Sequence, residues 1–245
     1  MTSKGKIYIG TSGWHYKHWK GTFYPKDIKE AEQLDFYLQF FSSVEINNSF
    51  YKLPNPKTFA AWRKSVPAGF IFAVKGSRFI THMKKLNVQR QNIQIFFDSV
   101  RKLKEKTGPI LFQLPPKWNV NAERLSFFLQ QLPTEYRYAF EFRNTSWYTS
   151  EVYDLLKKHR CAFCVYELGG HTSPVIVTTD FVYLRLHGPG AKYQGDYPDA
   201  TLAVWAERCR HWLQEGRDVY VYFDNDQEGY AAFNAGTLQS MIGDA

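Results

Sequence analysis

Residues 181–187 read Phe-Val-Tyr-Leu-Arg-Leu-His, and this stretch carries the pattern that decides the fold. Side chains alternate between the two faces of a β-strand. One face of this stretch therefore holds Val182, Leu184 and Leu186, and the other face ends in Arg185 and His187. The pattern predicts a strand with one apolar face against a layer of helices and a polar tip at its C-terminal end.

Seven further stretches have the same character, with short runs rich in β-branched and aromatic residues. Helical patterns separate most of them, and strands that alternate with helices predict a parallel sheet. Eight such units favour an α/β fold of the (β/α)₈ TIM type, a single barrel domain over residues 1–245. No convincing helix lies between the sixth and seventh strands, so that helix is expected to be missing or reduced. The eight predicted strands are Lys6–Gly10, Ser43–Asn47, Phe70–Lys75, Ile110–Gln113, Tyr138–Arg143, Cys161–Tyr166, Phe181–His187 and Asp218–Asp224.

The predicted helices have recognisable ends in two places. Asn87 is expected to cap a helix that stops before Gly108, and Thr149 begins a helix that ends in the basic run 157–160. Basic side chains at that end suit the negative pole of the helix dipole. The remaining helical patterns cover residues 30–40, 56–65, 121–131, 199–215 and 228–240.

Composition excludes several classes of protein. The chain has 245 residues, of which 44% are hydrophobic and 22% charged, so a disordered chain is excluded. Three cysteines are too few for a disulfide scaffold. The N-terminal residues have no apolar run suited to a signal peptide, and no run of about 18 apolar residues suggests a membrane span. We therefore expect a cytoplasmic protein that does not contact membranes.

The positive charge is concentrated in one part of the chain. The formal net charge is +8, yet residues 52–106 hold 13 Lys and Arg against Asp98 and Glu105, a net of +11. Such asymmetry attracts polyanions. It also fits a basic helix surface that serves only solubility, and the sequence leaves both readings open.

Polar residues recur at the C-terminal ends of the predicted strands. In a TIM-type barrel the active site lies at that face. Because several of these groups are charged, they are expected to form either a ligand or catalytic site or an ion-pair network that closes the barrel. The set comprises Glu45, Asn47, Lys75, Gln113, Glu141, Arg143, Arg185, His187 and Asp224.

Eight ordered motifs across nearly the whole chain resemble the YecE-like family, known as domain of unknown function 72. The resemblance implies a TIM-barrel fold and brings no established activity. Members of that family often carry Asn where this chain has Asp224. The motifs are GTSGW (10–14), WKGTFYP (19–25), EINNSFYKLP (45–54), FAVK (72–75), GPILFQLPP (108–116), EFRNTSW (141–147), YLRLHG (183–188) and YFDND (222–226).

Chemical roles follow from residue type. Glu45, Glu141 and His187 are the predicted catalytic residues, since two carboxylates across a barrel mouth and an imidazole suit acid–base work. The basic groups of the site would repel a metal cation, so no metal is expected, and no glycine fingerprint for a nucleotide cofactor is present. The predicted substrate-binding residues are Ser12, Trp14, Asn47, Lys75, Gln113, Arg143, Trp147, Arg185, Asp224 and Asn225.

Three other segments bear on a functional role. The glycine-rich loop 188–198 is a candidate lid. Cys161 and Cys164 have redox spacing, but residues three apart on a strand point to opposite faces, so both are expected in the core. The acidic residues of the 224–226 segment disfavour the phosphate site that many barrels have after strand eight.

Three hypotheses remain for the function. The first is a cofactor-independent hydrolase, lyase or isomerase that acts by acid–base chemistry on a small or medium polar, partly anionic substrate, which Arg143 and Arg185 would clamp. The second is nucleic-acid binding through residues 52–106, with Trp14, Trp19, Trp62 and Trp147 stacking on bases. The third is a barrel that binds a ligand without catalysis. The sequence does not indicate the oligomeric state.

Overall fold

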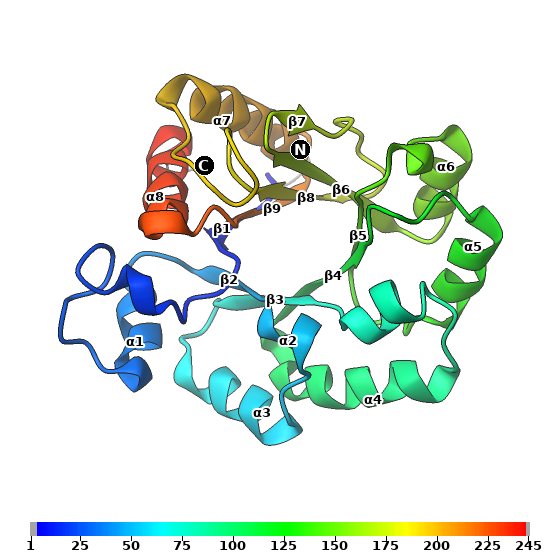
Figure 1. The fold of residues 1–245 in the computed structure, drawn as a ribbon, viewed down its shortest axis with the longest axis horizontal. Coiled ribbons are helices and arrows are strands. Elements are labelled where there is room, and N and C mark those ends of the chain that lie inside the picture. The colour runs from blue at the N-terminus through cyan, green and yellow to red at the C-terminus, as the bar shows by residue number, and fades with distance from the viewer. Residues whose placement is uncertain (1–3, 244–245) are drawn as a thin grey trace. The chain divides into compact units, whose positions relative to one another are not determined.

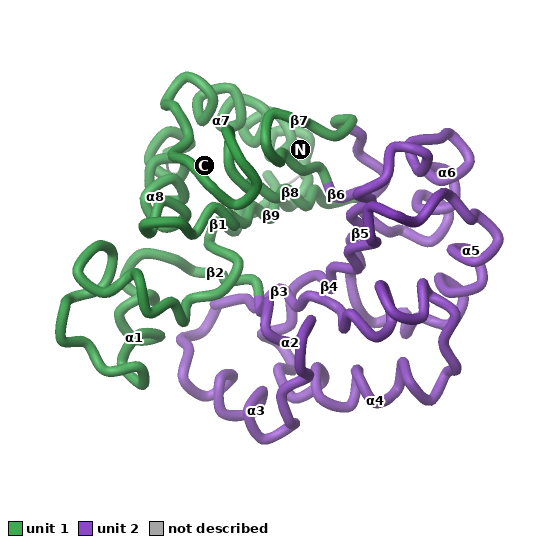
Figure 2. Tube along the Cα trace, in the orientation of Figure 1, with its two compact units in different colours: residues 1–45, 165–175, 180–245 green, residues 46–164, 176–179 purple. Residues whose placement is uncertain are grey.

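The computed structural model describes residues 4–243, which form eight parallel strands with helices between them (Figure 1). The order of strands and helices is that of an α/β TIM-type (β/α)₈ barrel, as predicted. The chain divides into two compact units, which Figure 2 colours separately. Unit 1 holds the residues up to 45, residues 165–175 and the residues from 180 onward, and unit 2 holds residues 46–164 and 176–179. A single domain over residues 1–245 stays a prediction.

Unit 1 is built around parallel strands from both ends of the chain. Strand β9 (Asp218–Phe223) pairs with β1 (Ile7–Thr11) on one side and with β8 (Phe181–Leu186) on the other. A parallel bridge joins Ser12 to Glu45 of β2 (Ser43–Ile46). The helices of this unit are α1 (Gln33–Tyr37), α7 (Asp199–Gln214) and α8 (Tyr230–Ile242), with 3₁₀ turns at Lys17–Trp19, Glu30–Glu32 and Gln227–Gly229.

Unit 2 continues the same design with four parallel strands. Strand β3 (Ile71–Lys75) pairs with β4 (Thr107–Leu114), β4 with β5 (Tyr138–Phe142), and β5 with the start of β6 (Cys161–Leu168). The helices are α2 (Asn48–Tyr51), α3 (Pro56–Ser65), α4 (Arg90–Val100), α5 (Ala122–Gln131) and α6 (Ser150–Lys158). A π-helix covers Phe79–Met83, and 3₁₀ turns cover Arg101–Lys106 and Thr145–Trp147.

The strand predictions are confirmed within a few residues, and so is the missing helix. Between β6 and β8 the structure holds the two-residue strand β7 (His171–Thr172), which pairs antiparallel with β6, and no helix. Thr149 caps α6 as predicted, since its side chain accepts a hydrogen bond from the Val152 amide at 3.3 Å. Among residues 4–243 no helix combines the length and the hydropathy that crossing a bilayer requires.

The prediction that Asn87 caps a helix was wrong. The cap of α4 is Gln89, which forms a capping box with Asn92. Asn87 instead closes a turn through its backbone amide, which donates to the Lys84 carbonyl at 2.9 Å. The helix also ends earlier than expected, at Val100, and Gly108 lies inside β4.

Strands β1 and β2 approach each other closely at Gly10. A side-chain carbon at this position would lie 2.1 Å from the Ser43 carbonyl oxygen, so only glycine fits. The Tyr37 hydroxyl fills the space beside it and donates to the same carbonyl at 3.0 Å. This close packing fixes the two strand ends from which Ser12 and Glu45 project.

Candidate functional site

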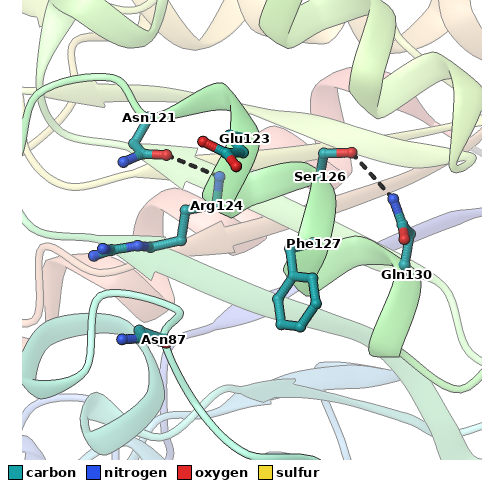
Figure 3. A pocket seen from close by; sticks show the side chains of 7 residues that line it. All are labelled: Asn87, Asn121, Glu123, Arg124, Ser126, Phe127 and Gln130. Atoms are coloured by element: carbon teal, nitrogen blue, oxygen red, sulfur yellow. Dashed lines mark hydrogen bonds between the residues drawn. The ribbon is translucent and has the colours of Figure 1, made fainter.

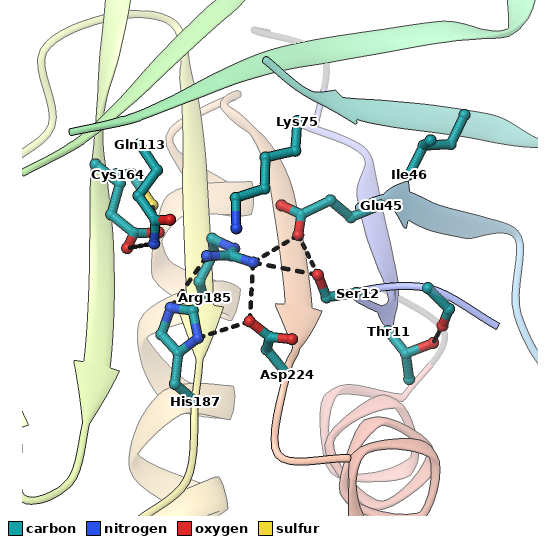
Figure 4. A network of polar contacts seen from close by, with 12 residues as sticks. Thr11, Ser12, Glu45, Ile46, Lys75, Gln113, Cys164, Arg185, His187 and Asp224 are labelled. Carbon is teal, nitrogen blue, oxygen red and sulfur yellow. Dashed lines mark hydrogen bonds and ion pairs between the residues drawn. The ribbon is translucent and has the colours of Figure 1, made fainter. Parts of the chain in front are cut away.

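Five of the predicted site residues form one polar network in unit 1. Ser12 follows β1, Glu45 lies in β2, Arg185 lies in β8, His187 follows β8, and Asp224 follows β9. Figure 4 shows their side chains converging on the guanidinium of Arg185. Alternation along the strands explains this convergence, because every member lies on the polar face that the sequence pattern marked.

Arg185 is the centre of this network and is fully buried, with an exposed fraction of 0%. Its Nη2 atom lies 2.7 Å from Glu45 Oε1, 3.0 Å from Asp224 Oδ2 and 3.1 Å from Ser12 Oγ. Its Nη1 atom lies 3.2 Å from Nε2 of His187. A buried guanidinium is costly unless it is paired, and two carboxylates offset that cost here.

Both carboxylate oxygens of Glu45 accept hydrogen bonds. Oε1 accepts from the Ser12 hydroxyl as well as from Arg185, and Oε2 accepts from the Tyr183 hydroxyl at 2.6 Å. Burial and the Glu45 charge raise the pKa of Tyr183 well above its ordinary value, so the phenol stays a donor. Tyr183 was not among the predicted site residues, although it shares the polar face of its strand with Arg185.

The partners of His187 define its proton positions. Arg185 can only donate, so Nε2 of His187 accepts, and the Asp224 carboxylate accepts from Nδ1 at 2.9 Å. These two contacts fit the tautomer that carries its proton on Nδ1. Because Arg185 occupies the Nε2 lone pair, His187 abstracts a proton in this arrangement only after the contact with Arg185 breaks.

A second set of groups, outside the predicted site residues, borders this network. The Tyr16 hydroxyl donates to the Ser12 carbonyl, and Nε2 of His18 lies 2.7 Å from the carbonyl oxygen of Asp226 and 3.4 Å from its Oδ2. Burial and the neighbouring Asp224 charge raise the pKa of Asp226. Burial, then the charges of Asp224, Asp226 and Glu45, raise the pKa of Tyr16. The sequence signal for this set is the aromatic and histidine-rich run 14–19.

Unit 2 gathers a separate polar cluster at the ends of β4 and β5. Oε1 of Glu141 accepts from the Gln113 amide at 2.7 Å and from Nε of Arg143. The Cys164 thiol lies 3.9 Å from the other carboxylate oxygen. Glu141 is fully buried, and the Arg143 side chain is nearly so.

Lys75, at the end of β3, lies in a basic environment that includes a histidine. Its ammonium nitrogen is 4.4 Å from the centre of the Phe50 ring, and the His82 ring meets the same Phe50 edge-on at 5.0 Å. Burial and the charges of Lys75, Arg78 and Arg143 lower the pKa of His82, against an opposing effect of Glu141. His82 belongs to the π-helix, which explains why no helical or strand periodicity marked it.

Two of the predicted binding residues, Trp14 and Trp147, are buried against other parts of the protein. Trp14 is buried, and its carbonyl accepts from the Tyr24 hydroxyl at 2.7 Å. Trp147 is buried beside Phe142, and its indole donates to the Trp118 carbonyl at 2.8 Å. With Trp19 also buried, three of the four tryptophans expected to stack on bases are enclosed by protein, which corrects that expectation. Asn225 is buried, and Asn47 lies partly exposed at the start of α2.

The Nδ2 group of Asn225 holds the loop 188–198. It donates to the Gly195 carbonyl and to Asn234 Oδ1, both at 2.8 Å. Asn234 in turn accepts from the Tyr197 amide at 3.2 Å and donates to Asp196 at 2.6 Å. The candidate lid is thus fastened to α8 at two of its residues.

The cysteines lie in the core, as expected. Cys161, Cys164 and Cys209 are free and buried, and burial raises the pKa of the Cys161 and Cys209 thiols to about 12. Such thiols are protonated and poor nucleophiles at neutral pH. Within the described range, 4–243, no three His, Cys, Asp or Glu side chains are arranged to hold a metal ion.

The predicted catalytic residues are not exposed to solvent, whereas residues that line an open pocket would be. Glu45, Glu141 and His187 are all fully buried. The sequence allowed either a ligand site or an ion-pair network, and the contacts around Arg185 are those of an ion-pair network. A single pocket shared by the clusters of unit 1 and unit 2 stays a prediction.

The fold and the site define the class of protein, a parallel (β/α)₈ barrel with charged side chains at its strand ends. The family model described as "Protein of unknown function DUF72" matches residues 8–245, and the chain belongs to this family. The resemblance drawn from the eight motifs is therefore confirmed.

Relatives and solved structures agree with this assignment. The UPF0759 protein YunF of Bacillus subtilis is 24% identical over 269 residues, covering 96% of this chain and 94% of YunF. The UPF0759 protein YecE of Escherichia coli K12 is 28% identical over 143 residues, 58% of this chain and 50% of YecE. A crystal structure of a DUF72 family protein from Thermotoga maritima has a TM-score of 0.88 at 28% identity, covering 97% of this chain and 99% of that one. A second, from Enterococcus faecalis, has a TM-score of 0.82 at 22% identity over 96% and 95% of the two chains, and supports the fold alone.

Proposed function

We propose that the protein is a cofactor-independent enzyme that performs acid–base chemistry on a small polar substrate with an anionic group. The supporting observation is the surroundings of His82, a partly exposed imidazole next to Lys75, Arg78 and Arg143. Three cations and the single carboxylate of Glu141 give this part of unit 2 a positive field. That field attracts an anionic substrate and keeps the imidazole neutral.

Each group then has a chemical role. Arg78, which is exposed, meets the anionic group first, and Arg143 and Lys75 hold it deeper. Neutral His82 takes a proton from the substrate, with Nδ1 oriented by the Thr81 hydroxyl at 2.9 Å. Glu141, positioned by Gln113, stabilises the positive charge that forms on the imidazole. The predicted catalytic roles of Glu45 and His187 stay predictions.

The test is a substrate panel of carboxylates and phosphate esters, measured on wild type and on His82→Gln, Glu141→Gln and Arg78→Ala. Loss of a general base is expected to lower kcat by roughly 10²–10⁴-fold. Arg78→Ala is expected to raise KM instead. The control is His211→Gln, an exposed histidine of α7 that pairs with Glu215. If a turnover is found and both His82→Gln and Glu141→Gln keep it, this assignment is wrong. Ligand stabilisation without turnover would favour the non-catalytic barrel.

The basic segment 52–106 supports a second candidate function, binding of nucleic acid. Its two acidic residues are already used, because Glu105 pairs with Arg63 at 3.0 Å and Asp98 with Arg101 at 3.1 Å. Exposed cations such as Lys64, Lys102 and Lys104 have no ion-pair partner among residues 4–243. Such a surface attracts phosphate backbones with a strong dependence on salt.

A further inference from the structure

A polar cavity of about 480 Å³ lies between α5 and the loop that precedes α4 (Figure 3). Its lining combines an arginine, an exposed aromatic ring and several amide or hydroxyl groups. None of these residues was among the predicted site residues, and none belongs to the strand ends described above. The lining consists of Asn87, Asn121, Glu123, Arg124, Ser126, Phe127 and Gln130.

The charged and aromatic groups of this cavity are available for a ligand. Among residues 4–243 the Arg124 guanidinium has no hydrogen bond or ion pair. The bond between Arg124 and Asn121 Oδ1, at 2.8 Å, uses the backbone amide of Arg124 and leaves its side chain available. Phe127 is 59% exposed, so its ring is open to solvent. Figure 3 shows Arg124 and Asn87 extending from the two walls toward the same side, with the Phe127 ring beside them.

A second cavity continues along the same helix. It has a volume of about 460 Å³ and shares Gln130 with the first. Its lining includes Arg90, Gln94, the Glu135 carboxylate and Arg101, which pairs with Asp98. Arg90 has no ion pair within the described part of the chain. Helix α5 has ten residues, so it is roughly 15 Å long. At about 3.4 Å per stacked nucleotide, that length suits about four nucleotides.

We propose that these two cavities form a binding groove for the nucleotides of a single strand, which we call the α4–α5 groove. Phe127 offers a face on which an unpaired base stacks, and Arg124 and Arg90 contact phosphates. The amides of Asn87, Asn121 and Gln130 supply hydrogen bonds to the sugar–phosphate backbone. Glu123 repels phosphate, so the backbone runs on the Arg124 side. The groove refines the second candidate function, on which it rests, and is independent of the proposed chemistry at His82.

The flanking segment adds positive charge at one end of the groove. Lys84 and Lys85 directly precede the loop that carries Asn87, and Lys84 is exposed. Cations at the groove entrance raise the local concentration of a polyanion and its rate of association. Stacking on a single ring tolerates any base, so the groove predicts weak dependence on base sequence.

The experiment measures fluorescence anisotropy of a labelled single-stranded oligouridylate, on the order of ten nucleotides long, at several salt concentrations. Phe127→Ala is expected to weaken binding roughly five- to hundredfold, and Phe127→Tyr to restore it. Arg124→Ala is expected to lower the slope of log affinity against log salt by about 0.7–1. Glu123→Gln is expected to tighten binding.

Matched controls separate the groove from the basic surface as a whole. Phe233→Ala removes another exposed ring, in unit 1, and Lys64→Ala removes an exposed cation of α3 outside the groove. Both are expected to leave the Phe127-dependent part of binding unchanged. A thermal unfolding curve for each variant establishes that it is folded.

The outcomes distinguish the two proposals. If wild type fails to bind the oligonucleotide even at low salt, both the groove and the second candidate function are wrong. If it binds, but Phe127→Ala binds equally well and Lys64→Ala weakens binding as much as Arg124→Ala, the groove alone is wrong. Stronger binding of a duplex would also contradict the groove, because stacking needs unpaired bases. Displacement by uridine monophosphate would assign the same groove to a single nucleotide.

Discussion

Glu45 and Asp224 both pair with Arg185, but they are held differently. Glu45 is fully buried and both of its oxygens accept hydrogen bonds, whereas the Asp224 contacts with Arg185 and His187 both use Oδ2 and its side chain is slightly exposed. An amide at position 224 still offers an oxygen to Arg185 and His187. An amide at position 45 removes the charge that pairs with Arg185 and leaves one acceptor oxygen where the carboxylate has two.

We therefore expect Glu45→Gln to destabilise the protein by about 3–5 kcal/mol, the cost of breaking a buried ion pair. Asp224→Asn is expected to cost about 1–2 kcal/mol, close to the loss of charge from one hydrogen-bonded group. Urea unfolding followed by circular dichroism measures both. Glu207→Gln, at an exposed ion pair of α7, is the control and is expected to change stability by less than about 1 kcal/mol. Equal losses at positions 45 and 224 would contradict this reading of the network.

The His82 imidazole gives a prediction with a definite sign. Its pKa in the folded protein lies below 6.5, because burial and the neighbouring cations disfavour the charged form. The lowered pKa of His82 therefore stabilises the folded protein at pH values above the unfolded pKa of about 6.5. This contribution is lost as the pH falls from there through the lower pKa of the folded state. Arg143→Ala is expected to raise the folded pKa, and Glu141→Gln to lower it further.

NMR titration of the His82 ring protons measures these shifts, and the exposed His211 provides an internal reference. Inorganic phosphate bound beside the ring is expected to raise the pKa of His82, because an anion favours the imidazolium. If the pKa of His82 responds neither to Arg143→Ala, nor to Glu141→Gln, nor to phosphate, the proposed influence of these charges on His82 is wrong.

At the residue scale the sequence identified which side chains share a face, but not their partners. Alternation placed Glu45, Arg185 and His187 on the polar side of their strands, as the structure has them. Alternation does not specify rotamers, so it could not predict that Arg185 is used by Glu45 and Asp224 rather than by an anionic ligand. Nor could it predict Tyr183, whose hydroxyl only becomes relevant once the Glu45 carboxylate is placed beside it.

At the scale of elements, the loop 188–198 depends on one helix residue. Asn234 of α8 bonds to Asn225, Asp196 and the Tyr197 amide, so its side chain fastens the loop to the end of β9. Asn234→Ala is expected to cost about 1–3 kcal/mol, because buried polar partners lose their bonds. Hydrogen exchange measured by mass spectrometry is expected to increase in residues 188–198. The control is Gln239→Ala on the exposed part of the same helix, and equal exchange in both variants would contradict the role of Asn234.

The elements missed in the sequence are the short ones. Helix α2 has four residues and the π-helix has five, too few for an apolar period to emerge. The long helices α3, α5 and α7 were predicted within one residue of their observed bounds. The π-helix carries His82 and directly follows Arg78, so no helical period supported the assignment of either residue to the site.

At the scale of the whole molecule, the excess of positive charge lies in one compact unit. All 13 basic residues of segment 52–106 belong to unit 2, and only two acidic residues in that segment offset them. The sequence located this asymmetry by counting alone. It could not locate the α4–α5 groove, because Phe127 and Arg124 lie outside the basic segment and reach it only through the packing of α5.

Repulsion among these cations predicts how stability depends on salt. The Debye length is about 30 Å at 0.01 M salt and about 8 Å at 0.15 M, so added NaCl screens repulsion between exposed lysines. The free energy of unfolding is expected to rise by about 0.5–1 kcal/mol over this range of salt. This estimate assumes that a few like-charge contacts, at about 0.2–0.5 kcal/mol each, are screened. Thermal unfolding at several NaCl concentrations measures it. The double variant Lys64→Gln/Lys102→Gln is expected to be more stable at low salt and less sensitive to NaCl. A fall in stability with salt would mean that the Arg63–Glu105 and Arg101–Asp98 ion pairs outweigh the repulsion.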